Sequence, residues 1–436
     1  MIKRLISLAK MRVYPIIVGL LLAPLLAGLI NWIVIDRLIA RARGPDSYKI
    51  YVIGNVERDD SAAQQIYKQF IAQGDLKTID GAPIEVRLED DQSDPEQARQ
   101  MAAKIAAKND TLMVIGHIGS TQTKAALPAY LAANPPVPVM LTTETNPNLT
   151  PPKLRSTKRF PIFRLSPNDE QQARSAAQFL ERTRAKAIWV VEDVDNPVYS
   201  SYLGSEFIRQ VQKSESRRVL LLTDNMRLPS VRAFDALKID WVFFAGGSDH
   251  ALVLIRQLQK MYAARPGILL TDASADKDLI TEGRSDVEGV YLTYPVRAAQ
   301  YAKFGHRIYG AMARDVTDYL IESAVTSDLS FGFSYELRHM LGIRSAHDAR
   351  ILLAAEIEDA QSSHTRFVLT NPLTNEMSLQ FGVGDGDDDG TRVDQNAAFD
   401  IWQICGGKFR DVAFEHTTTI FTASCAAAPA SKVDFD

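Results

Sequence analysis

The segment VIGHIGSTQT, residues 114–123, carries the side chains best suited to binding a small molecule. A strand pattern there leads through a glycine-containing turn into a helix pattern that begins near Ser120 or Thr121. At such a helix start, the unpaired backbone N–H groups and the positive end of the helix dipole can hold an anion such as a carboxylate. The hydroxyls of Ser120, Thr121 and Thr123 would lie on the same rim. A simpler interpretation, in which Ser120 or Thr121 only caps the helix, stays open.

A second polar segment, LTTETNPNLT at residues 141–150, follows the next strand pattern. In open α/β sheets, ligands bind in the crevice outside the carboxyl ends of the strands. Two polar rims after consecutive strands therefore predict a ligand-binding crevice in this part of the chain.

Motifs of enzymes and cofactor sites are missing from the sequence. It contains no GxxxxGK(S/T) phosphate loop, and no GxGxxG follows the first strand pattern. Residues 116–120, GHIGS, do not match the GxSxG of serine hydrolases, and the histidines show no HExxH or paired metal spacing. We expect His117 to be solvated or hydrogen-bonded rather than catalytic. The sequence therefore predicts a protein that is not an enzyme and that holds no cofactor or metal.

One acidic segment has part of the spacing of a calcium loop. Asp385, Asp387 and Asp389 stand at the first, third and fifth positions, and Gly390 stands at the sixth. The twelfth position is Asn396, where a calcium loop has a bidentate glutamate. The flanking patterns are those of strands rather than helices, which favours a solvated turn over a calcium site.

Composition and charge narrow the class of protein further. The 436 residues include 49 Lys and Arg against 53 Asp and Glu, a net charge of -4. No basic excess is available to neutralise a phosphate backbone, so we expect no nucleic-acid partner. Only Cys405 and Cys425 occur, which excludes a disulfide-dense scaffold and a four-cysteine zinc site. Whether these two cysteines pair stays open.

Residues 13–35 form a segment without a charged side chain, VYPIIVGLLLAPLLAGLINWIVI. At about 1.5 Å per helical residue it can cross a hydrocarbon core of roughly 30 Å, which predicts a transmembrane helix. Basic residues flank it on both sides and point only weakly to a cytoplasmic N-terminus. A cleaved signal peptide is the alternative, although its apolar stretch is typically about 7 to 15 residues. In either case we expect the rest of the chain to lie outside the cytoplasm, in the periplasm or extracellular space.

From Tyr48 onward, short β-rich runs alternate with longer helical patterns, which is typical of parallel sheets wrapped by helices. The strand patterns are KIYVIG (49–54), IEVRLED (84–90), TLMVIG (111–116), VPVML (137–141), AIWVVED (187–193), VLLLTD (219–224), WVFFAG (241–246), GILLTD (267–272) and GVYLTYP (289–295). The proline-rich segment FPIFRLSPND, residues 160–169, falls near the middle and favours two lobes joined there.

Residues 329–361 are expected to be mostly helical. Four β-like runs follow them, which are TRFVLT (365–370), EMSLQF (376–381), FDIWQI (399–404) and TTTIFTA (417–423).

Several of these stretches resemble one known family, the type I periplasmic binding proteins of the branched-chain amino-acid and amide group, typified by the Leu/Ile/Val-binding proteins. The supporting stretches are LEDDQSDPEQARQMAAKI (88–105), VIGHIGSTQTKAALPAY (114–130), VPVMLTTETNPNLT (137–150), FRLSPNDEQQARSAAQFL (163–180), WVVEDVDNPVYSSYLGSEF (189–207) and GTRVDQNAAFDIWQICGGKFRDV (390–412). These proteins are the solute receptors of ABC importers. The resemblance implies an α/β fold of two Rossmann-like lobes, joined by three hinge crossovers and closing on a ligand.

The resemblance and the apolar segment together divide the chain into discontinuous parts. The expected parts are a short cytoplasmic arm (1–12), a transmembrane anchor (13–35), a stalk (36–47), a first lobe (48–165 with 292–350), a second lobe (166–291 with 351–421) and a disordered tail (422–436).

The resemblance also implies roles for individual residues. Ser120 and Thr145, with neighbouring backbone N–H groups, would hold the α-carboxylate of an amino acid. The backbone carbonyl of Thr143 would help to hold its ammonium group, and Asp272 would pair with that group. Tyr199 would cover the ligand from the second lobe.

Two departures from the family pattern bear on the ligand. Glu144 places a carboxylate in a rim that otherwise favours anions, and NPVYSS (196–201) replaces the usual Tyr-Gly turn. The ligand could therefore differ from a simple aliphatic amino acid.

We expect a membrane-anchored, extracytoplasmic solute-binding protein that captures an amino acid or amide-like molecule between closing lobes. Its partners would be the permease and ATPase subunits of an ABC importer. The alternative is the ectodomain of a ligand-sensing receptor that reports to a signalling protein.

Overall fold

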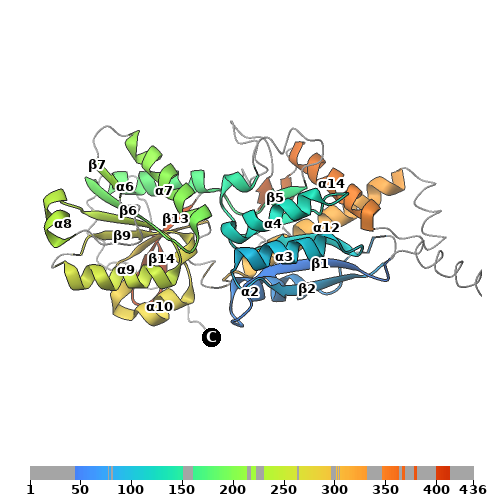
Figure 1. Cartoon of the computed structure of the whole chain (residues 1–436), viewed down its shortest axis with the longest axis horizontal. Coiled ribbons are helices and arrows are strands. Elements are labelled where there is room, and N and C mark those ends of the chain that lie inside the picture. The colour runs from blue at the N-terminus through green and yellow to red at the C-terminus, as the bar shows by residue number, and fades with distance from the viewer. Residues whose placement is uncertain are drawn as a thin grey trace, which may run out of the picture.

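The structure is a computed structural model that describes residues 45–412 with internal gaps. The gaps are residues 77, 80–81, 151–160, 214–217, 222–229, 263–264, 296–300, 302, 304, 331–345, 363–365, 369–377 and 381–398. Two sheets, each covered by helices, form two lobes that lie side by side (Figure 1).

The first lobe contains a five-stranded parallel sheet of strand order β2-β1-β3-β4-β5. The strands are β1 (Tyr48–Gly54), β2 (Ile84–Asp90), β3 (Thr111–Gly116), β4 (Val139–Leu141) and β5 (Ile162–Arg164). All residues of the central strand β3 are buried, whereas the edge strand β2 is only partly buried. This difference explains the continuous apolar run TLMVIG and the charged residues within IEVRLED.

Helices cover both faces of this sheet. They are α2 (Ala62–Ile71), α3 (Pro95–Ala106), α4 (Ser120–Ala132), α12 (Arg307–Ser330) and α14 (Ala346–Ser362), and a short 3-10 helix η1 (Pro147–Leu149) follows β4. Tyr51 and Ile53 of β1 pack with α3 and α4, whereas Ile50 and Val52 pack with α2 and α12. Successive strand side chains point to opposite faces, so one strand supplies both cores.

The second lobe contains a seven-stranded sheet of order β14-β13-β10-β9-β8-β6-β7. Its strands are β6 (Ala187–Glu192), β7 (Arg218–Leu221), β8 (Trp241–Ala245), β9 (Gly267–Leu270), β10 (Tyr291–Tyr294), β13 (Asp400–Ile404) and β14 (Phe409–Asp411). The strands from β6 to β10 pair in parallel, and β13 and β14 complete the sheet in antiparallel pairing.

The helices of the second lobe also lie on both faces of their sheet. The elements are α6 (Asp169–Arg182), α7 (Pro197–Gln212), α8 (Val231–Leu237), α9 (Ser248–Met261), α10 (Lys277–Gly283) and the 3-10 helices η2 (Asp272–Ser274) and η3 (Arg284–Val287). Helices α6 and α7 pack on one face around Phe207 and Phe243, and α8 and α9 pack on the other around Trp189 and Phe244.

The chain passes between the lobes after β5, after β10 and between α14 and β13. The last connection contains the antiparallel pair β11 (Arg366–Val368) and β12 (Ser378–Gln380) and otherwise lies outside the described residues. Helix α14 contacts α12 and β3, so the expected division at residue 350 falls inside a helix that packs on the first lobe. The two-lobed α/β architecture predicted from the alternating patterns is confirmed.

Two expectations concern parts of the chain that lie outside the described residues. The first is the transmembrane helix expected at residues 13–35. The second is the β-like run TTTIFTA (417–423) with the tail expected at 422–436. Within residues 45–412 as described, no helix combines the length and apolar character needed to cross a membrane.

Candidate ligand-binding site

A cavity of about 720 Å³ lies between the two lobes. Residues that follow the carboxyl ends of β3 and β4 line it from the first lobe, and residues that follow β6 and β9 line it from the second. Five of the six predicted binding residues line this cavity, namely Ser120, Thr143, Thr145, Tyr199 and Asp272. The sixth, Thr121, lies beside it. The tertiary structure therefore brings together residues that are up to 152 positions apart in the sequence.

The first wall of the cavity contains the start of α4. The helix begins at Ser120 after Gly119, and no side chain caps it. Ser120 is therefore the first helical residue and not the cap. The simpler interpretation, in which Ser120 or Thr121 only caps the helix, is wrong. Gly116, just before the turn, has a φ of 92°, and a Cβ there would collide with the carbonyl oxygen of Ile53. The uncapped N–H groups at this helix start are suited to an anion.

Thr121 makes a contact between the lobes. Its hydroxyl donates to Oδ1 of Asn196 at 2.6 Å and accepts the backbone N–H of Val198 at 3.4 Å. The side-chain amide of Asn146 donates to the carbonyl oxygen of Val198 at 2.5 Å. The start of α7 is thus tied to the start of α4 and to the loop after β4.

Glu144 does not line the cavity, although it stands in the polar rim between Thr143 and Thr145. Its Oε2 accepts the backbone N–H groups of Thr142 at 2.6 Å and Thr143 at 2.8 Å. Burial raises the pKa of Glu144 to about 7, and these backbone hydrogen bonds oppose the shift. Glu144 therefore holds the loop after β4 in place and occupies two N–H groups that a ligand carboxylate could otherwise use.

The opposite wall of the cavity is acidic. Asp272 is the first residue of η2, and only Thr271 separates it from the end of β9. Its Oδ1 accepts the Tyr199 hydroxyl at 2.6 Å and the side-chain amide of Gln172 at 2.6 Å. Burial raises the pKa of Asp272, while the Tyr199 and Gln172 hydrogen bonds favour its ionised form. Gln172 also donates to Oγ1 of Thr293 at 2.8 Å, so it joins α6, β10 and the cavity wall.

Asp169 adds a second buried carboxyl group at the first turn of α6. Burial raises the pKa of Asp169 well above its usual range, and the neighbouring Asp272 raises it further, whereas Thr145 and Arg164 lower it. A cation beside both groups would stabilise their ionised forms, and of the two only Asp272 lines the cavity. The sequence interpretation missed both Asp169 and Gln172. One feature of the sequence could have indicated them. They are three residues apart, so they lie on the same face of the predicted helix as Ala173, Ala176 and Phe179, which are buried.

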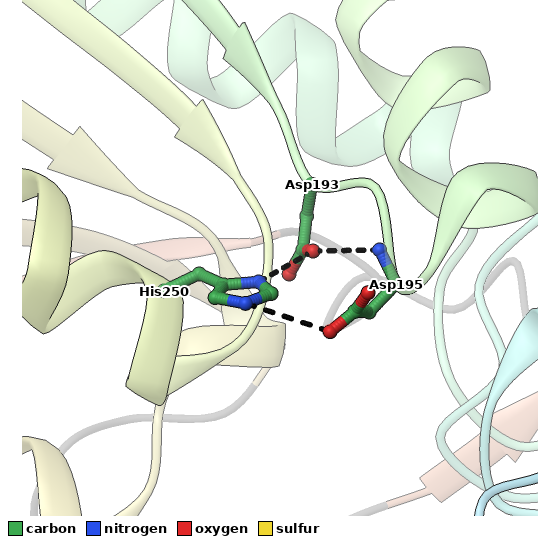
Figure 2. Close-up of side chains that lie close together, drawn as sticks. All are labelled: Asp193, Asp195 and His250. Atoms are coloured by element: carbon green, nitrogen blue, oxygen red, sulfur yellow. Dashed lines mark hydrogen bonds and ion pairs between the residues drawn. The ribbon is translucent and has the colours of Figure 1, made fainter. Parts of the chain in front are cut away.

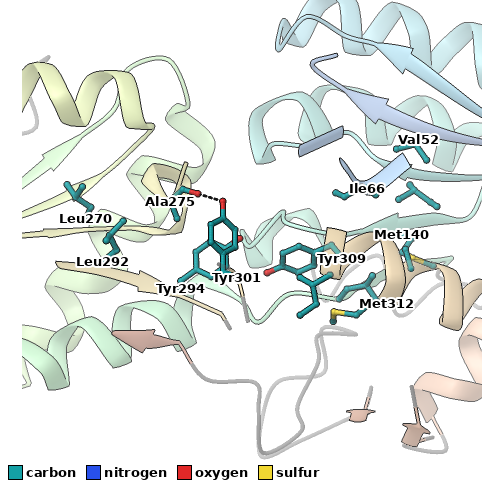
Figure 3. Close-up of a cluster of buried hydrophobic side chains, with 14 of the residues drawn as sticks. Val52, Ile66, Met140, Leu270, Ala275, Leu292, Tyr294, Tyr301, Tyr309 and Met312 are labelled. Carbon is teal, nitrogen blue, oxygen red and sulfur yellow. Dashed lines mark hydrogen bonds between the residues drawn. The ribbon is translucent and has the colours of Figure 1, made fainter. Parts of the chain in front are cut away.

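Part of the remaining lining is aromatic and includes Phe409 together with Tyr294, Tyr301 and Tyr309, which Figure 3 draws. The rings of Tyr294 and Tyr301 have centroids 4.8 Å apart, and Phe409 lies 6.0 Å from Tyr301. The Tyr301 hydroxyl donates to the carbonyl oxygen of Ala275 at 2.6 Å. Burial lowers the pKa of the adjacent His306 to about 4, which keeps this side chain neutral at physiological pH. These aromatic side chains suit an apolar group, and charged residues such as Asp60, Lys277 and Arg307 line the same cavity beside them.

His117 lies in the core of the first lobe. Its Nδ1 is 2.8 Å from Asp91, and its Nε2 is 3.0 Å from the Tyr130 hydroxyl. The ring is fully buried with both nitrogens partnered, in agreement with the hydrogen-bonded role that the sequence predicted.

Among the described residues, one set of side chains could hold a metal ion, formed by Asp193, Asp195 and His250 (Figure 2). Sequence spacing could not reveal it, because His250 is 55 residues beyond Asp195. The calcium-like loop from Asp385 to Asn396 lies outside the described residues. Cys405 is disulfide-bonded, and Cys425 also lies outside them.

Comparison with known sequences shows which proteins this chain resembles. A sequence profile of the family described as periplasmic binding protein matches residues 55–329. An amino acid binding protein of Pseudomonas aeruginosa is 27% identical over 227 residues, which cover 50% of this chain and 57% of that protein. A Leu/Ile/Val-binding protein homolog of Brucella abortus is 27% identical over 225 residues, covering 50% of this chain and 58% of that protein. The chain therefore matches somewhat more than half the length of these curated relatives.

Comparison with solved structures concerns the fold alone. The crystal structure of a leucine binding protein from Thermotoga maritima matches with a TM-score of 0.60 at 19% sequence identity. The match covers 84% of this chain and 98% of that one. The two lobes thus have the architecture of a type I periplasmic binding protein.

Proposed function

We propose that this chain, which belongs to the periplasmic binding protein family, captures an amino acid as a zwitterion between its two lobes. The family consists of binding proteins rather than enzymes. The observation that carries the proposal is the opposite character of the two cavity walls. The uncapped start of α4 at Ser120 suits a carboxylate, and the buried carboxyl group of Asp272, which lines the cavity, suits an ammonium group.

Each lining residue has a proposed part in this binding. Ser120 and Thr145 hold the α-carboxylate together with the first N–H groups of α4. The carbonyl of Thr143 and the carboxylate of Asp272 hold the ammonium group, and Tyr199 covers the ligand while its hydroxyl fixes Asp272. Thr121, which bonds to Asn196 across the lobes, acts in closure instead of contacting the ligand.

The ligand class that we propose is an amino acid with an apolar side chain, or an amide of similar shape. The walls formed by Tyr294, Tyr301 and Phe409 support an apolar side chain. The names of the relatives from Pseudomonas aeruginosa and Brucella abortus, an amino acid binding protein and a Leu/Ile/Val-binding protein homolog, point the same way.

In this proposal the ligand-bound chain works outside the cytoplasm and delivers its ligand to the permease and ATPase of an ABC importer. The apolar segment 13–35 would tether it to the membrane. The absence of charge over those residues supports the tether, and family membership supports the delivery role.

The binding proposal is tested by titrating the purified full chain with L-leucine, L-isoleucine, L-valine and L-phenylalanine by calorimetry. Ser120→Ala and Asp272→Asn should each weaken binding of the amino acid that binds the wild type. One hydrogen bond to a charged group contributes about 1.5–3 kcal/mol, so the dissociation constant should rise roughly tenfold or more.

Matched controls are Ser205→Ala, on the exposed side of α7, and Asp286→Asn, on the surface of the second lobe. Both should bind as the wild type does. Retained affinity in Ser120→Ala and Asp272→Asn would disprove the assigned pocket, and failure of all four amino acids would disprove the ligand class.

A further inference from the structure

A second cluster of polar side chains lies in the second lobe, outside the lining of the cavity. Asp193 directly follows β6, Asp195 stands two residues further along, and His250 lies in the first turn of α9. One potential ligand atom from each residue lies within 4.8 Å of the others. Figure 2 shows the imidazole ring between the two carboxylates.

Asp193 holds the imidazole of His250 in a fixed orientation. Its Oδ1 lies 2.7 Å from Nδ1 of His250 and also accepts the backbone N–H of Asp195 at 3.0 Å. Its Oδ2 accepts the backbone N–H of Gly247 at 2.9 Å, and the side chain is only 4% exposed. Metal-binding histidines commonly have a carboxylate on the second ring nitrogen, because it sets the tautomer and the ring orientation.

The other ring nitrogen faces Asp195 at a spacing that suits metal coordination. Nε2 of His250 is 3.5 Å from Oδ2 of Asp195, which is longer than the range of about 2.7–3.2 Å typical of N–H···O hydrogen bonds. Two ligands of tetrahedral Zn²⁺, with bonds of about 2.0–2.2 Å, are about 3.4 Å apart. The Asp195 side chain is 77% exposed, so water can reach the remaining coordination positions.

The surrounding charge favours a cation at this point. The carboxylates of Asp193 and Asp195 face the two ring nitrogens of His250, and Asp249 precedes His250 in the chain. These carboxylates favour a cation beside the imidazole.

We propose that Nε2 of His250 and the carboxylate of Asp195 bind a divalent transition-metal ion such as Zn²⁺, with Asp193 as the carboxylate that orients the imidazole. Imidazole and carboxylate together suit Zn²⁺, Ni²⁺ and Cu²⁺, and two water molecules would complete a tetrahedral Zn²⁺ site. The loop that carries Asp193 and Asp195 continues into Asn196, which contacts Thr121 of the first lobe. Bound metal would therefore order the segment that makes this closure contact.

The test is calorimetric titration of Zn²⁺ into the metal-free full chain, purified in detergent at neutral pH, with Co²⁺ absorption as a second measurement. The wild type should bind one Zn²⁺ per chain at this site. His250→Gln and Asp195→Asn should each reduce the affinity at least tenfold, and Asp193→Asn should reduce it by about 10- to 100-fold through loss of the outer carboxylate.

The matched control is His347→Gln. His347 is exposed and also has a carboxylate on its Nδ1, that of Asp348 at 3.1 Å, but it does not belong to a three-residue cluster within the described part of the chain. This variant should bind Zn²⁺ as the wild type does. Asp195→Asn keeps the proposal testable if His250→Gln fails to fold, because Asp195 is largely exposed.

The proposal fails if the wild type binds no Zn²⁺ at millimolar concentrations, or if a folded Asp195→Asn chain binds it with unchanged affinity. It also fails if His347→Gln removes the binding. None of these results depends on the amino-acid ligand of the cavity.

Discussion

Glu144 stands in the polar rim that the sequence predicted to bind an anion, yet its carboxyl group is directed into the protein. It accepts the backbone N–H groups of Thr142 and Thr143, and it is 1% exposed. Burial favours the protonated acid, whereas the two N–H donors favour the carboxylate. Burial has the larger effect, so the folded chain is favoured most when Glu144 is protonated.

The raised pKa of Glu144 predicts a pH-dependent stability. The pKa of Glu144 is about 7 in the folded chain, whereas the pKa of a glutamate in an unfolded chain stays near its usual value of 4.5. The free energy of unfolding should therefore fall as pH rises through this window, by up to about 3 kcal/mol from this one group. Glu144→Gln should remove that loss, so its stability relative to the wild type should increase between pH 4.5 and pH 7.

Denaturant unfolding of both chains at several pH values measures this difference. Glu282→Gln, an exposed acid on α10, is the matched control and should show a constant difference from the wild type. A stability difference for Glu144→Gln that does not change with pH would contradict the assigned ionisation.

The positions of Gln172 and Asp169 beside the cavity wall could not be predicted from their residue types. Gln172 bonds to Asp272, 100 residues away, and to Thr293, 121 residues away. In the sequence both residues belong to the first turns of an amphipathic helix, where polar side chains usually face water. Their role became visible only when α6 packed against β10.

At the scale of elements, the ends of α4 and α7 meet across the lobes. Both helices begin directly after parallel strands of their own sheets, and neither has a side-chain cap at its start. Helix starts of this kind carry free N–H groups, so a ligand and the partner lobe can both use them. The hydroxyl of Thr121 joins α4 to the start of α7, and the amide of Asn146 joins the loop after β4 to the same helix start.

Thr121→Val should weaken this contact while keeping the shape of the side chain. The loss of a neutral hydrogen bond costs about 0.5–1.5 kcal/mol, so amino-acid affinity should fall roughly two- to tenfold if the contact forms on closure. Small-angle scattering of the full chain with saturating ligand should also show a more open average shape.

Thr326→Val, on the exposed surface of α12, is the control for this substitution. It should leave both the amino-acid affinity and the scattering curve unchanged. If Thr121→Val binds ligand with wild-type affinity and scatters identically, closure does not depend on the α4–α7 contact.

At the scale of the whole molecule, the two lobes are interleaved in the sequence. The first lobe receives α12 and α14 after the second lobe has begun, and the second lobe receives β13 and β14 from the end of the described chain. The connecting segments join two lobes that are each held together by chain from both sides of them, and we propose that they act as hinges. Tyr301, on one connection, packs against Trp402 of β13 and Phe409 of β14.

The proposed membrane tether predicts in which cell fraction, membrane or soluble, the whole chain is found. Because residues 13–35 carry no charge, the full-length chain should stay in the membrane fraction after alkaline carbonate extraction. N-terminal sequencing of that material should give the start of the chain. A mature chain that begins after residue 35 and appears in the soluble fraction would instead identify a cleaved signal peptide.

The sequence by itself determined the local elements and the general kind of protein. Each of the nine strand patterns between residues 49 and 295 coincides with an observed strand, because a run of apolar and β-branched side chains is a local signal. It missed β5, which lies inside the proline-rich segment 160–169, and the three-residue β14. Such short strands exist because neighbouring strands supply their hydrogen bonds, and a local pattern does not record that pairing.

Only the tertiary structure decided which polar groups meet. It directed Glu144 away from the cavity, placed Gln172 on Asp272, and set His250 between Asp193 and Asp195. These contacts join residues of different elements, so they depend on sheet order and helix packing rather than on spacing in the sequence. The sequence could identify the helix start at Ser120 because an uncapped helix end is a local property, whereas the acidic wall opposite it exists only where the two lobes face each other.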